Sequence, residues 1–164
     1  MKDFKYLFAY TVPVSVYMSF VSSGVWTYTA VFYVFLILPG LDLLLGETKD
    51  NLSDQDVAYM KKKWIFDLML YLNFPIVFGL LYVVFSMYEV NGFTTFETIG
   101  LALSTGILLA TNGINVAHEL GHRSSYFERL ISKLLYMPCL YMHFYIEHNF
   151  GHHLHVATPN DGAT

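Results

Sequence analysis

The chain has 164 residues, of which 55% are apolar and 13% are charged, and its mean hydropathy is +0.44. Soluble domains carry about 25% charged residues, so this chain has too few polar side chains to cover a soluble fold of its size. The small net charge of -4 argues against a nucleic-acid partner, and the single cysteine, Cys139, excludes an internal disulfide framework and a cysteine-rich metal site. We therefore predict an all-α integral membrane protein.

Four apolar runs are long enough to cross a hydrocarbon layer of about 30 Å, which takes roughly 20 helical residues. These runs are residues about 4–22, about 25–45, about 64–88 and about 96–117. They predict a polytopic transmembrane helix bundle of four spans within one membrane domain, residues 1–164. A fifth apolar stretch, about 130–146, contains Pro138 and is interpreted either as a further span or as an interfacial segment.

The basic residues predict the orientation of the bundle. All nine lie before or at the start of the first run, between the second and third, or after the fourth: Lys2, Lys5, Lys49, Lys61, Lys62, Lys63, Arg123, Arg129 and Lys133. An even number of crossings separates these segments, so they share one side, which the positive-inside rule assigns to the cytoplasm. We expect the N-terminus and the later histidine clusters there. Asp42 and Asp67, near cytoplasmic helix ends, are interpreted as interfacial capping residues.

The first histidine cluster lies in NVAHELGHR, residues 115–123. His118 and His122 are four residues apart, which puts both imidazoles on one face of a helix, where they can hold one metal ion. Asn115 lies one turn earlier on the same face and is placed to orient a ligand. A metal-bound imidazole usually donates its other N–H to a carboxylate or carbonyl, so Glu119 is either such a hydrogen-bond partner or a ligand.

The second cluster lies in EHNFGHHLHVATPND, residues 147–161. His148 and His152 repeat the spacing of four, and His153 is rotated by about 100° from His152 on a helix, which suits two metals or a bridging geometry. Five imidazoles exceed what one tetrahedral zinc uses, and such sites also suit copper or iron. We predict that the metal ligands are His118, His122, His148, His152 and His153.

The remaining polar residues near the second cluster receive supporting roles. Glu147, like Glu119, neighbours a ligand and is a candidate hydrogen-bond partner or ligand. His143 is interpreted as a residue that supports a ligand or lies at the membrane interface. His155 would share the face of His148 and His152 only if a helix continued past residue 153, and Pro159 soon ends that arrangement.

Two interpretations follow from the residues alone. HELGH fits the H-E-x-x-H pattern of an intramembrane zinc metalloprotease, in which the glutamate activates water, but this interpretation leaves EHNFGHH unexplained. A non-enzymatic metal-binding or transport protein is the other. Transporters carry polar residues near the bilayer midplane on broken helices, whereas these histidines are predicted to lie at one membrane face.

A third interpretation comes from resemblance. NVAHELGHR, followed about thirty residues later by EHNFGHHLHVATPND, resembles the first two histidine boxes of the bacterial membrane-bound alkane 1-monooxygenases, and PGLDLLLGE at 39–47 resembles a helix end in that family. The wider superfamily contains membrane fatty-acid desaturases and hydroxylases, which remain an alternative. Desaturases typically have two residues between the first histidine and the His-His pair of the second box. This chain has three, Asn149, Phe150 and Gly151, which favours hydroxylation.

The resemblance implies a non-haem di-iron centre held almost wholly by histidines in the bacterial inner membrane. It implies O₂ as co-substrate, electrons from rubredoxin that is itself reduced by a reductase, and insertion of one oxygen atom into the terminal C–H bond of an alkane or related apolar chain. An alkane has no polar group, so it is recognised by burial, at about 0.8 kcal/mol per CH₂. Membrane lipid is therefore the expected route of the substrate.

The sequence departs from the family pattern at its end. The family has further histidine motifs after additional membrane helices, and this chain reaches only Thr164. Where relatives usually have Asp-Pro-Ala after VATP, this chain has Asp161, Gly162 and Ala163. We therefore expect that the chain is the N-terminal portion of a longer protein, or else a natural truncation, and that five histidines alone do not complete a di-iron centre.

Overall fold

A computed structural model describes residues 2–46, 63–158 and 160–161 of the chain. These residues form helices joined by turns, with no strand among them, which confirms the predicted all-α class. Lys49, Lys61, Lys62 and Pro159, which the sequence analysis used, lie outside the described residues. The chain divides into two compact units, Met1–Leu108 and Leu109–Thr164. The prediction of a single membrane domain stays a prediction.

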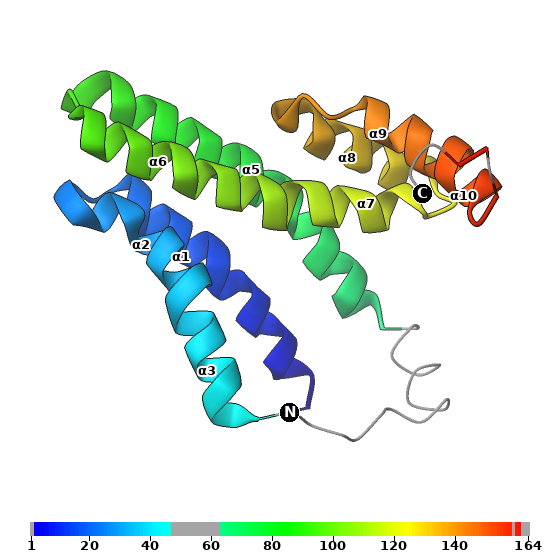
Figure 1. The fold of residues 1–164 in the computed structure, drawn as a ribbon, viewed down its shortest axis with the longest axis horizontal. Coiled ribbons are helices and arrows are strands. Elements are labelled where there is room, and N and C mark those ends of the chain that lie inside the picture. Colours follow the sequence, from blue (N-terminus) through cyan, green and yellow to red (C-terminus); the bar gives the residue numbers. More distant parts are fainter. Residues whose placement is uncertain (1, 47–62, 159, 162–164) are drawn as a thin grey trace. The chain divides into compact units, whose positions relative to one another are not determined.

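The first unit is built from long helices (Figure 1). The 3-10 segment η1 (Lys2–Tyr10) leads into α1 (Thr11–Phe20). After a short turn, η2 (Gly24–Tyr28), α2 (Thr29–Phe32), the π-helical η3 (Tyr33–Ile37) and α3 (Leu38–Leu45) follow without a break. Two further helices, α5 (Trp64–Asn91) and α6 (Thr95–Leu108), complete the unit, and α1 packs against α2, α5 and α6.

Three helical stretches of the described chain are long and apolar enough to cross a membrane: Gly24–Leu45, Trp64–Asn91 and Thr95–Gly121. They coincide with the second, third and fourth predicted spans. The first predicted span folds into η1 and α1 but is not among these three, so the count of four stays a prediction. Only 6% of an 18-residue apolar segment within Gly24–Leu45 is buried. Side chains that face outward in this way need lipid or other helices around them, as expected of a membrane protein.

Polar contacts tie together two connections of the first unit. Thr94 and Glu97 form a capping box at the start of α6: the Glu97 carboxylate accepts from the Thr94 N–H at 2.9 Å, and the Glu97 N–H donates to Thr94 Oγ1 at 3.3 Å. The same carboxylate accepts from the Gly24 N–H at 2.6 Å. The connections at 22–24 and 92–94 therefore lie at the same end of this unit, as the predicted even number of crossings requires.

The core of the first unit depends on small residues. Ser19 is fully buried and accepts from the Ala30 N–H at 2.9 Å, and buried Ser104 donates to the Thr27 carbonyl at 3.0 Å. Gly100 of α6 lies directly against η2, where a Cβ would meet Thr27 Oγ1 and come within 2.7 Å of the Tyr28 ring. Small residues of this kind let membrane helices approach closely.

Gly100→Ala is expected to destabilise the first unit. The added methyl must displace Thr27 or Tyr28, and overpacking of this kind typically costs about 1–3 kcal/mol. Gly106 is the matched control, because it is exposed on the same helix and its Cβ would meet no atom within 4 Å. Thermal unfolding in detergent should show a lower midpoint for Gly100→Ala and an unchanged or higher one for Gly106→Ala. Equal midpoints would show that this contact does not limit stability.

The second unit consists of shorter helices. The π-helical η4 (Leu109–Ile114) continues into α7 (Asn115–Gly121), and α8 (Tyr126–Tyr136) packs against α7. The 3-10 turn η5 (Met137–Cys139) follows, and then α9 (His143–Ile146), the π-helical η6 (Glu147–His152) and α10 (His153–His155) run on continuously.

The fifth apolar stretch, about 130–146, is not one helix. Pro138 lies in η5, where it ends α8, and Leu140 adopts a left-handed backbone with φ of 53°. A proline removes a backbone donor and clashes with the preceding turn, so the chain breaks there and restarts in α9. No helix of this stretch is among the three described stretches long enough to span a membrane.

Candidate metal centre

The glycine of HELGH sets the spacing between the helices that carry the histidines. A Cβ on Gly121 would lie 3.1 Å from Ser132 Oγ on α8 and 3.4 Å from the Tyr145 ring on α9. Buried Ser132 also donates to the Ala117 carbonyl of α7 at 2.6 Å. Because Tyr145 precedes His148 by less than one turn, close packing at Gly121 brings the second histidine cluster up to the first.

Four histidines meet in the second unit. The ligand-type nitrogens of His118, His122, His148 and His153 all lie within 4.8 Å of one another. His118 and His122 come from α7, with ring centroids 4.8 Å apart. His148 lies 4.3 Å from His118 and 4.5 Å from His153 by the same measure. Residues about thirty positions apart in the sequence thus form one imidazole group, which we call the four-histidine group.

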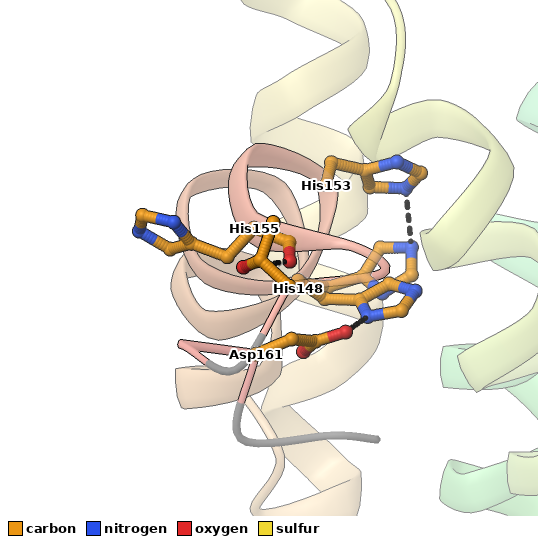
Figure 2. Close-up of polar contacts among 6 residues, drawn as sticks. His148, His153, His155 and Asp161 are labelled. Atoms are coloured by element: carbon orange, nitrogen blue, oxygen red, sulfur yellow. Dashed lines mark hydrogen bonds and ion pairs between the residues drawn. The ribbon is translucent and has the colours of Figure 1, made fainter.

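Three Nε2 atoms converge within the four-histidine group. His148 Nε2 lies 2.6 Å from His118 Nε2 and 3.0 Å from His153 Nε2, the second contact drawn in Figure 2. A ring nitrogen of a neutral imidazole either donates one proton or accepts with one lone pair. Three imidazole nitrogens therefore face one point, and each offers a lone pair there when its ring carries the proton on Nδ1. Convergent imidazole lone pairs are the donor set that zinc, copper and iron bind.

The dimensions of the four-histidine group fit a transition-metal ion. Imidazole nitrogen lies about 2.0–2.1 Å from zinc, so two nitrogens on one ion are at most about 4.2 Å apart. The largest separation in the group, 4.8 Å, exceeds this limit by a little. His122 and His153 are exposed, so their rings can turn inward without disturbing the core. The residues present therefore fit a bound metal after a small contraction.

A π-helical turn decides which histidine of the second cluster joins the group. Spacing on an α-helix predicts that His148 and His152 share a face and that His153 diverges. Residues Glu147–His152 instead form η6, a π-helix, in which residues five apart come together. His153 is five residues after His148 and contacts it through Nε2, while the His152 ring centroid is 5.6 Å from those of both neighbours.

The environment keeps His148 neutral. Partial burial, followed by the neighbouring imidazoles, lowers the pKa of His148 to about 4. Phe144, one turn earlier, stacks on its ring at 4.8 Å and meets His118 edge-on at 6.0 Å. Since metal ligation requires the neutral imidazole, His148 presents the binding form at neutral pH. Phe144 also covers one side of the four-histidine group with an apolar face.

Two predicted residues contact other partners. His152 directs Nδ1 to the Asp161 carboxylate at 2.9 Å and is not part of the four-histidine group. Glu119 pairs with Arg123 at 3.0 Å on the exposed side of α7. The glutamate that a zinc metalloprotease would need to activate water is thus engaged by an arginine, and four imidazoles rather than two meet, which weakens the protease interpretation.

The other candidates lie around the group. Asn115 is exposed at the start of α7, and Glu147 is exposed at the start of η6. His143 lines a pocket of about 690 Å³ together with Arg129 and Lys133, and none of the four histidines lines this pocket. Figure 2 shows the His155 ring pointing away from His148 and His153. Metal binding by the five predicted histidines and the supporting roles of these residues stay predictions.

Two further residues, Phe144 and Asp161, contact the site histidines and were not predicted from the sequence. Phe144 is four residues before His148, a spacing that places both rings on one helix face, so its stacking was open to prediction. Asp161 is nine residues beyond His152, and no local periodicity connects them. Only the turn that follows α10 brings that carboxylate to the imidazole.

Comparison with known proteins identifies the relatives of this chain. It is 38% identical over 130 residues to the alkane 1-monooxygenase of Pseudomonas putida, a match that covers 78% of this chain. Alkane 1-monooxygenase 1 of Alcanivorax borkumensis shows the same identity over 78% of the chain, and alkane 1-monooxygenase 2 of that organism is 31% identical over 100% of it. The chain is homologous to the alkane 1-monooxygenases.

The match is to a part of each relative. The chain spans 32% of the Pseudomonas putida protein and 45% of alkane 1-monooxygenase 2 of Alcanivorax borkumensis. No protein-family model matches the chain. The homology confirms the resemblance drawn from the two histidine boxes, and the four-histidine group brings together residues from both of these stretches.

Proposed function

We propose that the intact protein is a membrane monooxygenase that hydroxylates the terminal carbon of alkanes or related apolar chains. The observation that carries the proposal is the convergence of His118, His122, His148 and His153 in a homologue of alkane 1-monooxygenases. The function is proposed for the whole protein and not for this chain alone, because the chain spans less than half the length of these relatives.

The proposed cofactor is a non-haem di-iron centre. The four-histidine group, with His152 beside it, supplies imidazole ligands, and residues of the intact protein outside this chain complete the set. When bound, the iron supplies activation of O₂, with one oxygen atom inserted into the C–H bond and the other leaving as water after two electrons and two protons. The proposed electron donor is rubredoxin, reduced in turn by its reductase.

The residues of this chain perform the binding and shielding. His148 holds the centre of the imidazole group and is neutral at physiological pH. Phe144 excludes water from one side of it. The hydrocarbon substrate is proposed to enter from the bilayer, which the apolar stretches Gly24–Leu45, Trp64–Asn91 and Thr95–Gly121 are long enough to cross. We place the protein in the bacterial inner membrane with the histidines on the cytoplasmic side, where a soluble electron donor can reach them.

The test is metal content and turnover of the purified intact protein from iron-supplemented cells. We expect about two irons per chain and conversion of octane to 1-octanol with label from ¹⁸O₂, dependent on reduced rubredoxin. The matched control is the same preparation without rubredoxin. About one zinc per chain with no iron and no octanol would reject the monooxygenase and return attention to the HELGH metalloprotease.

A further inference from the structure

The second histidine cluster ends in a compact turn that reverses the chain. The Thr158 N–H and hydroxyl donate to the His155 carbonyl at 3.0 and 2.6 Å, and the Asp161 N–H donates to the Thr158 carbonyl at 3.1 Å. Ala157 takes a left-handed backbone with φ of 62°. These contacts link Asp161 through Thr158 to the end of α10.

This turn buries a carboxylate against an imidazole. The Asp161 side chain is 1% exposed, and its Oδ2 lies 2.9 Å from His152 Nδ1, as drawn in Figure 2. A buried carboxylate is costly unless it is paired and hydrogen-bonded. The position of Asp161 is therefore specified by its contacts.

The contact places a carboxylate oxygen at hydrogen-bond distance from His152 Nδ1. A carboxylate oxygen is a hydrogen-bond acceptor, so this neighbour favours the His152 tautomer that carries its proton on Nδ1. A neutral imidazole that carries its proton on Nδ1 has its lone pair on Nε2. That is the tautomer of metal-bound histidines, which donate their other ring N–H to a carboxylate that orients the ring and raises its basicity.

His152 lies next to the four-histidine group. Its ring stacks on His148 with an interplanar angle of 22°, and its centroid is 5.6 Å from those of His148 and His153. Its Nδ1 is engaged by Asp161, so Nε2 is the nitrogen with which it would bind a metal. His152 is thus a fifth imidazole beside the other four, with its orientation set by a residue outside both histidine boxes.

We propose that Asp161 is a positioning residue that holds His152 with Nε2 available to the metal. This inference rests on the proposed function only in taking the four-histidine group as the metal centre. In this proposal, Asp161, the aspartate after VATP, fixes the tautomer and the ring orientation of one ligand. The proposal also explains why a carboxylate is buried close to the proposed metal centre.

The test compares variants of the intact, metal-loaded protein. Asp161→Ala is expected to weaken metal binding about 10- to 100-fold, the usual cost of losing such a partner, and X-ray absorption should show fewer imidazole ligands per metal. Asp161→Asn should lie between Asp161→Ala and the parent, because an amide oxygen still accepts the proton without the charge. Asn160→Ala is the matched control, since Asn160 is the exposed neighbour in the same turn.

A double-mutant cycle separates positioning from folding. If Asp161 acts through His152, Asp161→Ala should cause no further loss of metal affinity in a His152→Ala background. An equal loss in both backgrounds, or an Asp161→Ala protein with the affinity and imidazole count of Asn160→Ala, would overturn the proposal.

The two proposals fail in different ways. If the unmutated protein holds zinc in place of iron, the proposed monooxygenase function is rejected. The role of Asp161 can still be tested, because the metal affinities of the variants are then compared with zinc. A parent that hydroxylates octane while Asp161→Ala matches Asn160→Ala removes only the positioning role. A parent that binds neither metal overturns both.

Discussion

His148→Ala should strip the intact protein of metal and of hydroxylase activity. His148 Nε2 is the atom that both His118 and His153 approach, at 2.6 and 3.0 Å. Its loss removes the centre of the four-histidine group, so metal affinity should fall by more than the roughly 10- to 100-fold typical of losing an outer hydrogen-bond partner. Metal per chain and the rate of 1-octanol formation are the measurements.

His155→Ala is the control for this prediction. His155 is seven residues from His148 on the same segment, and its ring points away from His148 and His153 (Figure 2). It should retain the metal content and the rate of the parent. Equal metal content in the two variants would show that the four-histidine group is not the metal site.

Gly121→Val should separate the two histidine clusters. The Cβ alone would lie 3.1 Å from Ser132 Oγ and 3.4 Å from the Tyr145 ring, and the two methyl groups of valine need more room still. Overpacking typically costs about 1–3 kcal/mol, and relief requires α8 or α9 to move away from α7. We expect a lower thermal unfolding midpoint together with a loss of bound metal, because His148 moves with Tyr145.

Gly151→Val provides the matched substitution. A Cβ on Gly151 meets no atom within 4 Å, so this variant makes the same substitution at a helical glycine without the clash, and it should retain metal. Adding Ser132→Ala to Gly121→Val removes the nearest atom of the contact and should restore part of the loss. If Gly121→Val and Gly151→Val lose metal equally, close packing at Gly121 does not assemble the site.

The substitutions at His148, Gly121 and Asp161 remove three different kinds of interaction at the site. His148 tests the imidazoles themselves, Gly121 tests the packing that brings α7 and η6 together, and Asp161 tests a contact that orients one ring. A mutation at Gly121 should lower stability and metal content together. If Asp161 acts through His152, its loss should lower metal affinity only when His152 is present. Measurements of stability and metal affinity therefore distinguish the His148, Gly121 and Asp161 variants.

Composition and periodicity were sufficient for the helices and for the first half of the site. Long apolar runs can be stable only as helices in lipid, because every backbone polar group must be satisfied within the segment. Three of the four predicted spans are therefore found as helices long and apolar enough to cross a membrane. His118 and His122 lie together on α7, because a spacing of four on a regular helix depends on local geometry alone.

The second half of the site was decided by tertiary structure. A π-helical turn at Glu147–His152 changes the period of the helix, so His153 joins His148 where regular α-helical spacing predicts His152. His152 instead meets Asp161, which a chain reversal carries to it. Neither event leaves a periodic signal, because each depends on contacts that form only when the segment packs. The sequence by itself determined the apolar helices and the set of imidazoles. Packing decided how the imidazoles are arranged.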